Sequence, residues 1–417
     1  MNFRHTIPIL ISCGALLHPP TGRAASNSAP WEIEIAPVRQ RVAALKQQLG
    51  HAAGVPEVAD QFQSIPKDGR WLGREEARLE FQRLVAEAAQ RRWWKTGLDP
   101  AGLDHALREP ASVICGCVHQ HRAGLRDRDA SSRLSREAAD FLLWAQSQAG
   151  TGVIPFPAYR GPTRDNALAA ARRFLERSER AGKLDQVVRN GWIFEDGGDG
   201  GLQFDNGEAG VALFELYEVS GDTNLLAAAG DAANWSMSRP LAANWNYNSF
   251  SVYLLAKAFA ITREQRYLGA ATRKALVGVI PGQLTEGPRT GRWLDPHNAR
   301  PAYHYIMLRA LAALAAVLPP EDSARPEIMR ALKLGLQARN PDFLGPGAPN
   351  KDHAMEALLL VNRTFAADRQ FLSETHSVAA LEALGRLVSE TARQGKMPLA
   401  PGPYGRFLEY VLWQTSH

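Results

Sequence analysis

The sequence contains no run of lysine or arginine residues. Its 48 Lys and Arg side chains stand against 43 Asp and Glu side chains, which gives a formal net charge of +5. Arg4 and Arg23 supply two of these charges and lie in a segment that we expect to be removed, so +3 remains, spread along the chain. Nucleic-acid-binding proteins usually gather basic side chains in one region. The charge pattern therefore argues against a nucleic-acid partner.

Long apolar runs are also missing after the first residues. No later stretch approaches the roughly 18 uninterrupted apolar residues that a membrane-spanning helix needs. We therefore predict no transmembrane segment in the mature chain. With 45% hydrophobic and 22% charged residues, the chain has the composition of an ordinary globular protein that buries a substantial core.

Cysteine is scarce: the sequence has three, and two of them stand in the stretch I-C-G-C-V-H-Q-H. If this stretch is an extended strand, Cys115, Cys117, His119 and His121 share one face, which is a donor set for a soft metal. One contiguous strand cannot easily surround a tetrahedral ion. We therefore expect buried thiols or a strained local disulfide here, and we predict no metal site and no cofactor.

The first residues, Met1 to Ala25, have the layout of a secretory signal peptide. A basic start is followed by an apolar run from Ile7 to Leu17 and by small residues around Ala24. The stretch Leu10-Ile11-Ser12-Cys13 also fits a lipoprotein cleavage site, in which Cys13 would carry the lipid. We expect a periplasmic or secreted protein.

One stretch, Gly191 to Tyr217, combines glycines with carboxylates before an amphipathic helix. Glycine tolerates tight turns, so the loop can direct several acidic groups into one space. Asp196, Asp199, Asp205 and Glu208 are suitable calcium ligands, but their spacing does not match an EF-hand loop. The alternative is a solvated loop in which Asp205 or Asn206 caps the next helix.

After Asn206 the chain is repetitive, with helical segments before and after short polar turns. The turns S-G-D-T-N-L-L, T-R-E-Q-R-Y-L and A-A-D-R-Q-F-L each end in an apolar pair that would seat a second helix. Units therefore run from Glu208 to Trp235, Asn246 to Val279, Arg300 to Arg339 and Lys351 to Arg393. A further helix is predicted from Ser132 to Gln148, and helices are also predicted between Trp31 and Lys95. These patterns predict an all-α protein built from antiparallel helical hairpins.

The repeated hairpins resemble the (α/α) toroid of six-hairpin glycosidases, polysaccharide lyases and related sugar epimerases. The resemblance covers roughly Ser132 to the C-terminus and rests on the glycine-aspartate turns and on the Glu208 to Tyr217 segment. Together with the signal peptide expected over residues 1–25, it divides the chain into an N-terminal helical region over residues 26–130 and a toroid over residues 131–417. It further implies a cleft at the loops that precede the inner helices, with a carbohydrate polymer or oligosaccharide as the partner. The same ring occurs in prenyltransferases and terpene cyclases, which leaves that class open.

Polar and aromatic residues gather in the segments that would precede the inner helices. Aromatic rings pack on the apolar faces of sugars while amides and carboxylates bond their hydroxyls. The alternative is that the tryptophans belong to the core and the Asp and Asn residues cap helices. A weaker fourth segment is Asn350-Lys351-Asp352-His353. The candidate substrate-binding residues are Trp192, Asp196, Asp199, Trp245, Tyr247, Asn248, Trp293, His297, Asn298, Arg300 and Tyr305.

Two reactions suit such a cleft. Glycoside hydrolysis needs two carboxyl groups, and Asp205 or Glu208 together with Asp295 are the candidates. β-Elimination needs a base, an acid and a group that neutralises a uronate, for which Tyr303 and His304 with Asn298, His297 or Arg300 are the candidates. The sequence leaves both open, together with a non-catalytic protein that binds glycans or assists envelope assembly.

Overall fold

The computed structural model describes residues 30–48, 62–95, 107–125, 129–163 and 166–414. These residues form sixteen α-helices and three strands of two residues each, so the prediction of an all-α protein is confirmed. Within these residues, no helix combines the length and the apolar character that crossing a membrane requires. The signal peptide and Cys13 lie outside the described residues.

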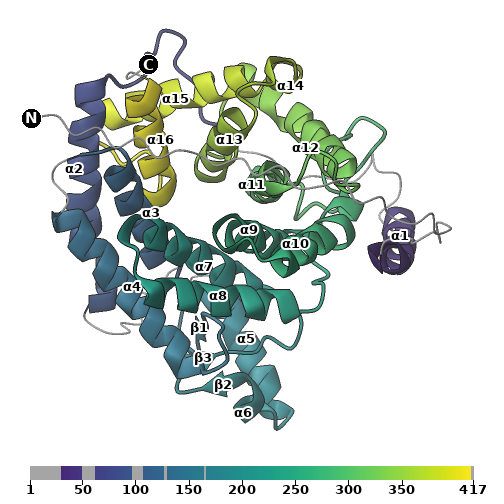
Figure 1. Cartoon of the computed structure of the whole chain (residues 1–417). Coiled ribbons are helices and arrows are strands. Elements are labelled where there is room, and N and C mark those ends of the chain that lie inside the picture. Colours follow the sequence, from purple (N-terminus) through teal and green to yellow (C-terminus); the bar gives the residue numbers. More distant parts are fainter. Residues whose placement is uncertain (1–29, 49–61, 96–106, 126–128, 164–165, 415–417) are drawn as a thin grey trace, which may run out of the picture.

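Six helices form a closed inner ring (Figure 1). Each one packs against its two neighbours in the ring, and the last packs against the first. An outer helix returns the chain after each of the first five inner helices, so all six inner helices begin at the same end of the ring. In ring order they are α3 (Arg108–Arg122), α7 (Gly201–Ser220), α9 (Trp245–Thr262), α11 (Pro301–Val317), α13 (Asp352–Thr364) and α16 (Pro401–Gln414).

Six further helices form the outer layer, each packed mainly on one inner helix. The outer helix α2 packs on α16, so elements from opposite ends of the chain complete the sixth hairpin. Helices α2 and α3, which precede residue 131, are thus part of the ring. The outer helices are α2 (Arg74–Gln90), α4 (Asp129–Ala149), α8 (Thr223–Ser238), α10 (Gln265–Gly278), α12 (Arg325–Arg339) and α15 (Ser377–Arg393).

The predicted turns join the helices as expected. Asp222 caps α8 by accepting a hydrogen bond from the Asn224 amide at 2.9 Å. Asp368 caps the short helix α14 (Arg369–Glu374) through the Phe371 amide in the same way. The apolar pair that follows each polar turn packs inward, as the buried Leu225, Leu268 and Leu372 show. Capping and apolar anchoring together fix where the second helix of a hairpin begins.

Side-chain hydrogen bonds tie the starts of the inner helices to the outer layer. The Asn206 side chain donates to the Ala232 carbonyl on α8, and Asn248 donates to the Gly278 carbonyl on α10. The ring of His304 contacts the Gly335 carbonyl on α12 at 2.8 Å. Each of these inner residues is buried. Because a buried polar group without a partner is costly, these bonds fix the spacing of the two layers.

The contact between α3 and α16 closes the ring at a pair of glycines. A Cβ atom on Gly405 would lie 2.8 Å from the Gly116 Cα, and one on Gly116 would lie 2.8 Å from the Pro401 carbonyl oxygen. Two helices can approach this closely only where neither carries a side chain. Cys115 and Cys117 flank this glycine as free, buried thiols. The expectation of an extended strand here is wrong, because the stretch lies inside α3.

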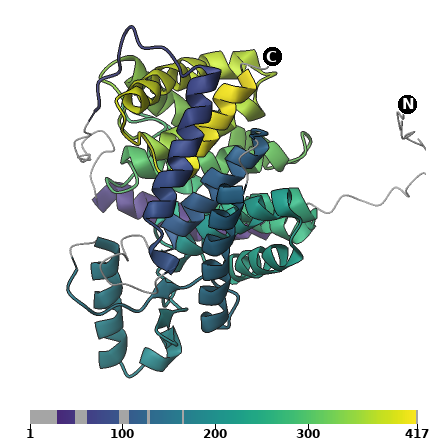
Figure 2. The same ribbon diagram turned by 90° about the vertical axis from the view of Figure 1, so that its left-hand side faces the viewer.

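An inserted unit lies between α4 and α7 and stands at the edge of the ring (Figures 1 and 2). Its strand β3 (Trp192–Ile193) pairs antiparallel with both β1 (Phe156–Pro157) and β2 (Val188–Arg189). It also contains α5 (Asn166–Arg180) and α6 (Leu184–Val187). A separate helix, α1 (Pro30–Gln48), packs on the outside of the ring against α10.

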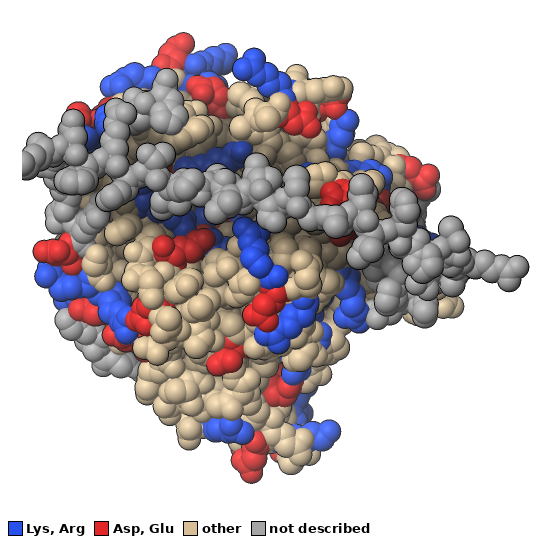
Figure 3. Space-filling model, viewed as in Figure 1, with Lys and Arg blue, Asp and Glu red and all other residues tan. Residues whose placement is uncertain are grey.

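Short 3-10 helices complete the fold at Trp93–Lys95, Ile280–Gly282 and Asn340–Leu344. Acidic and basic side chains are interspersed on the face seen in Figure 3, and neither sign dominates its visible part. This distribution agrees with the scattered charge of the sequence.

Candidate functional site

A cavity of about 670 Å³ lies where the inner helices begin. Polar side chains from four of these helices line it: Arg108 and Ser112 from α3, Glu208 from α7, Asp352, His353 and Glu356 from α13, and Arg406 from α16. Tyr253 of α9 reaches it from deeper in the ring, and Leu84, Val113, Met397 and Leu399 supply apolar wall. We call this space the central cavity. Its mixture of carboxylates, cations and apolar surface is typical of a ligand site.

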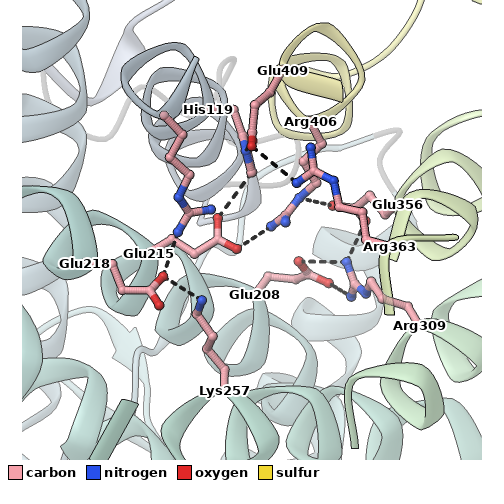
Figure 4. Close-up of polar contacts among 11 residues, drawn as sticks. His119, Glu208, Glu215, Glu218, Lys257, Arg309, Glu356, Arg363, Arg406 and Glu409 are labelled. Atoms are coloured by element: carbon pink, nitrogen blue, oxygen red, sulfur yellow. Dashed lines mark hydrogen bonds and ion pairs between the residues drawn. The ribbon is translucent and has the colours of Figure 1, made fainter. Parts of the chain in front are cut away.

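Arg309 of α11 organises one side of the central cavity (Figure 4). Its guanidinium group is 2% exposed, donates to Glu356 at 2.5 Å and also bonds Glu208. The Arg309 Cζ atom lies 4.4 Å from the centre of the Tyr253 ring. A buried cation is stable only when it is paired in this way, so one arginine from α11 holds two carboxylates from α7 and α13 in place.

The pKa values follow from this pairing. Burial alone would raise the pKa of Glu356, but Arg309, His353 and Arg406 together lower it to about 2. Burial would lower the pKa of Arg309, and the two carboxylates instead raise it above its ordinary value. Glu356 is therefore ionised at neutral pH. Burial raises the pKa of Tyr253, so its phenol keeps its proton.

A second cluster of charges continues across the ring (Figure 4). Arg406 donates to Glu215 at 2.7 Å, and the buried His119 lies between Glu215 and Glu409. Burial would raise the pKa of Glu215, but Arg406 holds it well below the usual range. Below the cluster, a space of about 50 Å³ is lined by Tyr253, Glu356 and Arg406 among others. The charged layer thus forms the floor of the central cavity.

The structure brings one predicted catalytic residue, Glu208, into the central cavity. Four other predicted residues, Asp196, Asp199, Asp205 and Tyr247, line a neighbouring cavity of about 340 Å³. We call this space the side cavity.

The acidic loop ends earlier than expected. Helix α7 begins at Gly201, so Asp205 and Asn206 lie inside the helix, and the expectation that either one caps it is wrong. The Asp196 carboxylate instead accepts from the Leu202 amide at 3.0 Å, and Asp199 accepts from the Gly201 amide at 2.8 Å. These acids therefore satisfy the first amides of α7.

The predicted tryptophans do not reach either cavity. Trp192 packs edge-on against Trp144, and Trp293 donates to the Val279 carbonyl at 2.9 Å. Trp245 is 2% exposed at the first turn of α9. Each ring is held in the core, which is the alternative that the sequence left open.

His304 and Tyr305 are also core residues. His304 packs edge-on against Trp293, and burial lowers its pKa to about 3, so it stays neutral. Tyr305 donates to the Asn340 side chain at 3.1 Å. Because His304 is bonded to the outer helix α12, the structure does not place it beside a substrate in either cavity.

The remaining predicted residues hold the loop before α11 and the start of α9. Asp295 accepts from the Asn298 amide and side chain at 2.9 and 3.0 Å, and Asn298 accepts from the Asn246 amide. His297 stacks on Tyr303 with ring centres 4.4 Å apart. None of these, nor Arg300 or Asn248, lines the central or the side cavity.

The sequence reasoning missed most residues of the central cavity, including Arg309, Glu356, Arg406 and Tyr253. His353 belonged to the segment judged weakest. A signal was present: single charges interrupt apolar stretches in M-L-R-A-L, A-M-E-A-L, L-F-E-L-Y and Y-G-R-F-L. Since an isolated charge inside an apolar helix must find a partner, such positions indicate buried ion pairs.

In the described part of the chain, no group of three or more His, Cys, Asp or Glu side chains is arranged to hold a metal ion. Burial raises the pKa of Cys117 to about 12, and it also raises that of Cys115, so both remain protonated thiols. Protonated thiols are poor metal ligands and poor nucleophiles.

The solved structures that resemble the chain include the following two. One is a polysaccharide lyase, with a TM-score of 0.50, 15% sequence identity, and coverage of 81% of this chain and 98% of that one. The other is a glycosyl hydrolase family 88 protein from Bacteroides vulgatus, with a TM-score of 0.48, 13% identity, and coverage of 83% and 99%. No protein-family model matches the chain, and no curated protein is detectably similar to it. The likeness to the lyase is one of fold, and it confirms the predicted helical toroid.

Proposed function

We propose that the chain is a carbohydrate-active enzyme that binds an oligosaccharide or polysaccharide in the central cavity and cleaves it there. The observation that carries this proposal is the convergence of His353, Tyr253, Glu208 and Arg406 on one cavity at the starts of the inner helices. The fold likeness to a polysaccharide lyase supports it. Because a fold alone does not determine an activity, the argument rests on these side chains.

The groups in the cavity favour β-elimination on a uronic-acid glycan. Glu356 has a pKa of about 2, so it cannot supply a proton to a leaving oxygen. His353 lines the cavity, and its Nδ1 atom makes no hydrogen bond within the described chain but lies 3.8 Å from Glu356 Oε2. The phenol of Tyr253 keeps its proton. His353 and Tyr253 are therefore the groups suited to proton exchange.

In this mechanism His353 removes the proton beside the uronate carboxylate. The electron pair forms a carbon-carbon double bond as the bond to the leaving oxygen breaks, and Tyr253 donates its proton to that oxygen. Arg406, on the cavity wall, stabilises the charge that develops on the carboxylate. The products are one unsaturated sugar end and one new reducing end.

Hydrolysis is the second candidate, because Glu208 and Glu356 line the same cavity and share Arg309. A glycosidase needs two such carboxyl groups, one of which must carry a proton when the bond breaks. The ionised Glu356 would then activate water or attack the sugar, which leaves Glu208 as the proton donor.

A screen of the purified chain against uronic-acid and neutral glycans tests the proposal. Ultraviolet absorbance of unsaturated products and reducing ends are measured in parallel. We expect both signals to rise together on uronic-acid substrates, and we expect His353→Ala and Tyr253→Phe each to lower kcat by about 10²- to 10⁴-fold. Glu264→Gln, on an exposed turn far from the cavity, serves as the control.

If reducing ends form without a rise in ultraviolet absorbance, the reaction is hydrolysis and not elimination. Glu208→Gln should then abolish activity. Binding without turnover on every substrate would overturn the enzyme proposal in favour of a glycan-binding protein. Turnover of an isoprenoid diphosphate instead would favour the terpene cyclase or prenyltransferase class.

We also propose that the chain is exported, from the layout of Met1 to Ala25. N-terminal sequencing of the protein recovered from cells tests this. A start just after Ala25 is expected, whereas a lipidated Cys13 would indicate a membrane-anchored lipoprotein, and an intact Met1 in the cytoplasm would overturn export.

A further inference from the structure

The side cavity lies where the inserted unit meets the ring. Its ring wall carries Asp196, Asp199, Asp205 and Tyr247, and its opposite wall is formed by α5 with Arg173, Phe174 and Arg177. Phe156 and Ile193 of the small sheet supply an apolar floor. Figures 1 and 2 show that α5 belongs to the unit that projects from the edge of the ring. The insertion thus supplies a wall that the inner helices alone do not provide.

The carboxylates on the ring wall are already engaged. Both oxygens of Asp205 accept from Arg108, at 2.9 and 3.3 Å. Both oxygens of Asp196 accept backbone amides, at 2.9 and 3.0 Å, and burial raises the pKa of this residue. One oxygen of Asp199 accepts the Gly201 amide. This wall therefore presents mostly compensated charge.

The wall on α5 differs, because its two guanidinium groups are available. Arg173 and Arg177 are four residues apart and so lie on the same face of the helix. They line the side cavity, and within the described residues neither guanidinium group makes a hydrogen bond or an ion pair. Their neighbours Arg172 and Arg180 instead contact Glu176 on the helix itself. Guanidinium groups bind carboxylates and sulfates through paired hydrogen bonds.

The two cavities adjoin at the ion pair between Arg108 and Asp205. Arg108 of α3 lines both cavities. On α7, Asp205 lines the side cavity, whereas Phe204 and Glu208 line the central one. A chain of sugars that occupies the central cavity can therefore pass the Arg108 side chain and place its next unit under α5.

We propose that the side cavity binds a second, acidic sugar unit of the same glycan, whose carboxylate or sulfate is held by Arg173 and Arg177. Tyr247 and the remaining oxygen of Asp199 bond hydroxyl groups of that unit. This inference rests on the proposed function of the central cavity, and it makes the inserted unit the part of the molecule that selects long, anionic substrates.

The test measures binding and cleavage of uronic-acid oligosaccharides from disaccharide to hexasaccharide, together with carboxyl-reduced forms of the same lengths. The chain is compared with the double variant Arg173→Gln/Arg177→Gln and with Arg180→Gln as the control on the same helix. We expect the double variant to weaken binding of the longer acidic substrates by about tenfold or more, and that of disaccharides and reduced forms by less than about twofold. Arg180→Gln should bind every substrate like the unchanged chain.

Sulfated neutral oligosaccharides of the same lengths show whether the side cavity prefers a carboxylate or a sulfate. A tenfold loss of binding by the double variant, with either the uronic-acid or the sulfated series, supports the proposal. Unchanged binding of long acidic substrates by the double variant, with cleavage intact, would overturn the side-cavity assignment and leave the proposed function standing. Equal losses for neutral and acidic substrates would overturn the preference for an anion. If the unchanged chain neither binds nor cleaves any glycan, the proposed function fails and this inference fails with it.

Discussion

The polar residues of the inner helices form two groups that face opposite sides of the ring wall. Asn206, Asn248 and His304 face outward and bond carbonyl groups of α8, α10 and α12. Glu208, Arg309 and Glu356 face the ring axis and pair with one another. The outward residues are uncharged and join layers, whereas the inward residues are charged and form the floor of a cavity. The same helices thus separate structural from site residues by helical face.

This comparison explains why polar residues at the start of an inner helix are poor guides to the site. Asn206 and Glu208 are two residues apart, and in a helix such neighbours point in nearly opposite directions. One links layers and the other lines the central cavity. Whether a polar residue belongs to the site therefore depends less on its type or its position in the sequence than on whether its helical face points toward the ring axis.

The largest expected effect comes from removing the shared cation of the inward group. Arg309→Met removes the cation that two partly buried carboxylates share, and of the described cations only Arg406 and His353 then remain near Glu356, so we expect a loss of about 3 kcal/mol in the free energy of unfolding. Denaturant unfolding measures it. Arg266→Met, in an ion pair whose arginine is 49% exposed, is the control and should cost less than about 1 kcal/mol. Equal losses for the two variants would show that the inward charges are no more coupled than a surface pair.

The second largest effect is expected in how folding stability depends on pH, through Glu356 of the inward group. The pKa of Glu356 is about 2 in the folded chain, against an ordinary value of 4.5. A lowered carboxyl pKa contributes stability that is fully present above pH 4.5 and is lost as the pH falls toward 2. The contribution is at most about 3 kcal/mol.

We therefore expect the stability gap between the unchanged chain and Glu356→Gln to narrow as the pH falls through this window. Unfolding measured across a series of acidic buffers tests it. A gap that stays constant over the whole series would contradict the assignment of an ionised Glu356.

The outward group should affect stability without affecting the reaction. Asn248→Ala removes hydrogen bonds to the Ala242 amide and carbonyl and to the Gly278 carbonyl, so we expect a loss of about 2–3 kcal/mol. The kcat/KM of the folded protein should stay within about twofold. The exposed Asn224→Ala is the matched control, with a cost below about 0.5 kcal/mol. A large fall in kcat/KM with unchanged stability would place Asn248 in the site after all.

The hairpins could be predicted from the sequence because their signals are local. A polar turn with an aspartate cap and a following apolar pair occupies fewer than ten residues, and such patterns do not depend on the rest of the chain. The resemblance to a toroid followed from repeating this unit. The predicted hairpins around Asp222 and Asp368 accordingly match α8 and α14.

The central cavity could not be predicted in the same way, because its residues meet only when the ring closes. Arg309 bonds Glu208 from 101 positions away and Glu356 from 47 positions away. No local pattern indicates which partner a lone charge will find. The stretch around Cys115 shows the same difficulty: the role of Gly116 as the contact with α16 depends on a helix almost 300 residues later.

Closure of the ring by α16 has a consequence for the order in which the protein is made. The inner helices emerge from the ribosome one after another, and α16, which carries Gly405 and Arg406, follows the other five. Until then Glu215 lacks its cation and the seam beside Gly116 stays open. A nascent chain that lacks α16 therefore exposes apolar surface along the seam and leaves Glu215 without its arginine, and chains with exposed apolar surface are prone to aggregate. The inner ring therefore closes only after α16 has been synthesised.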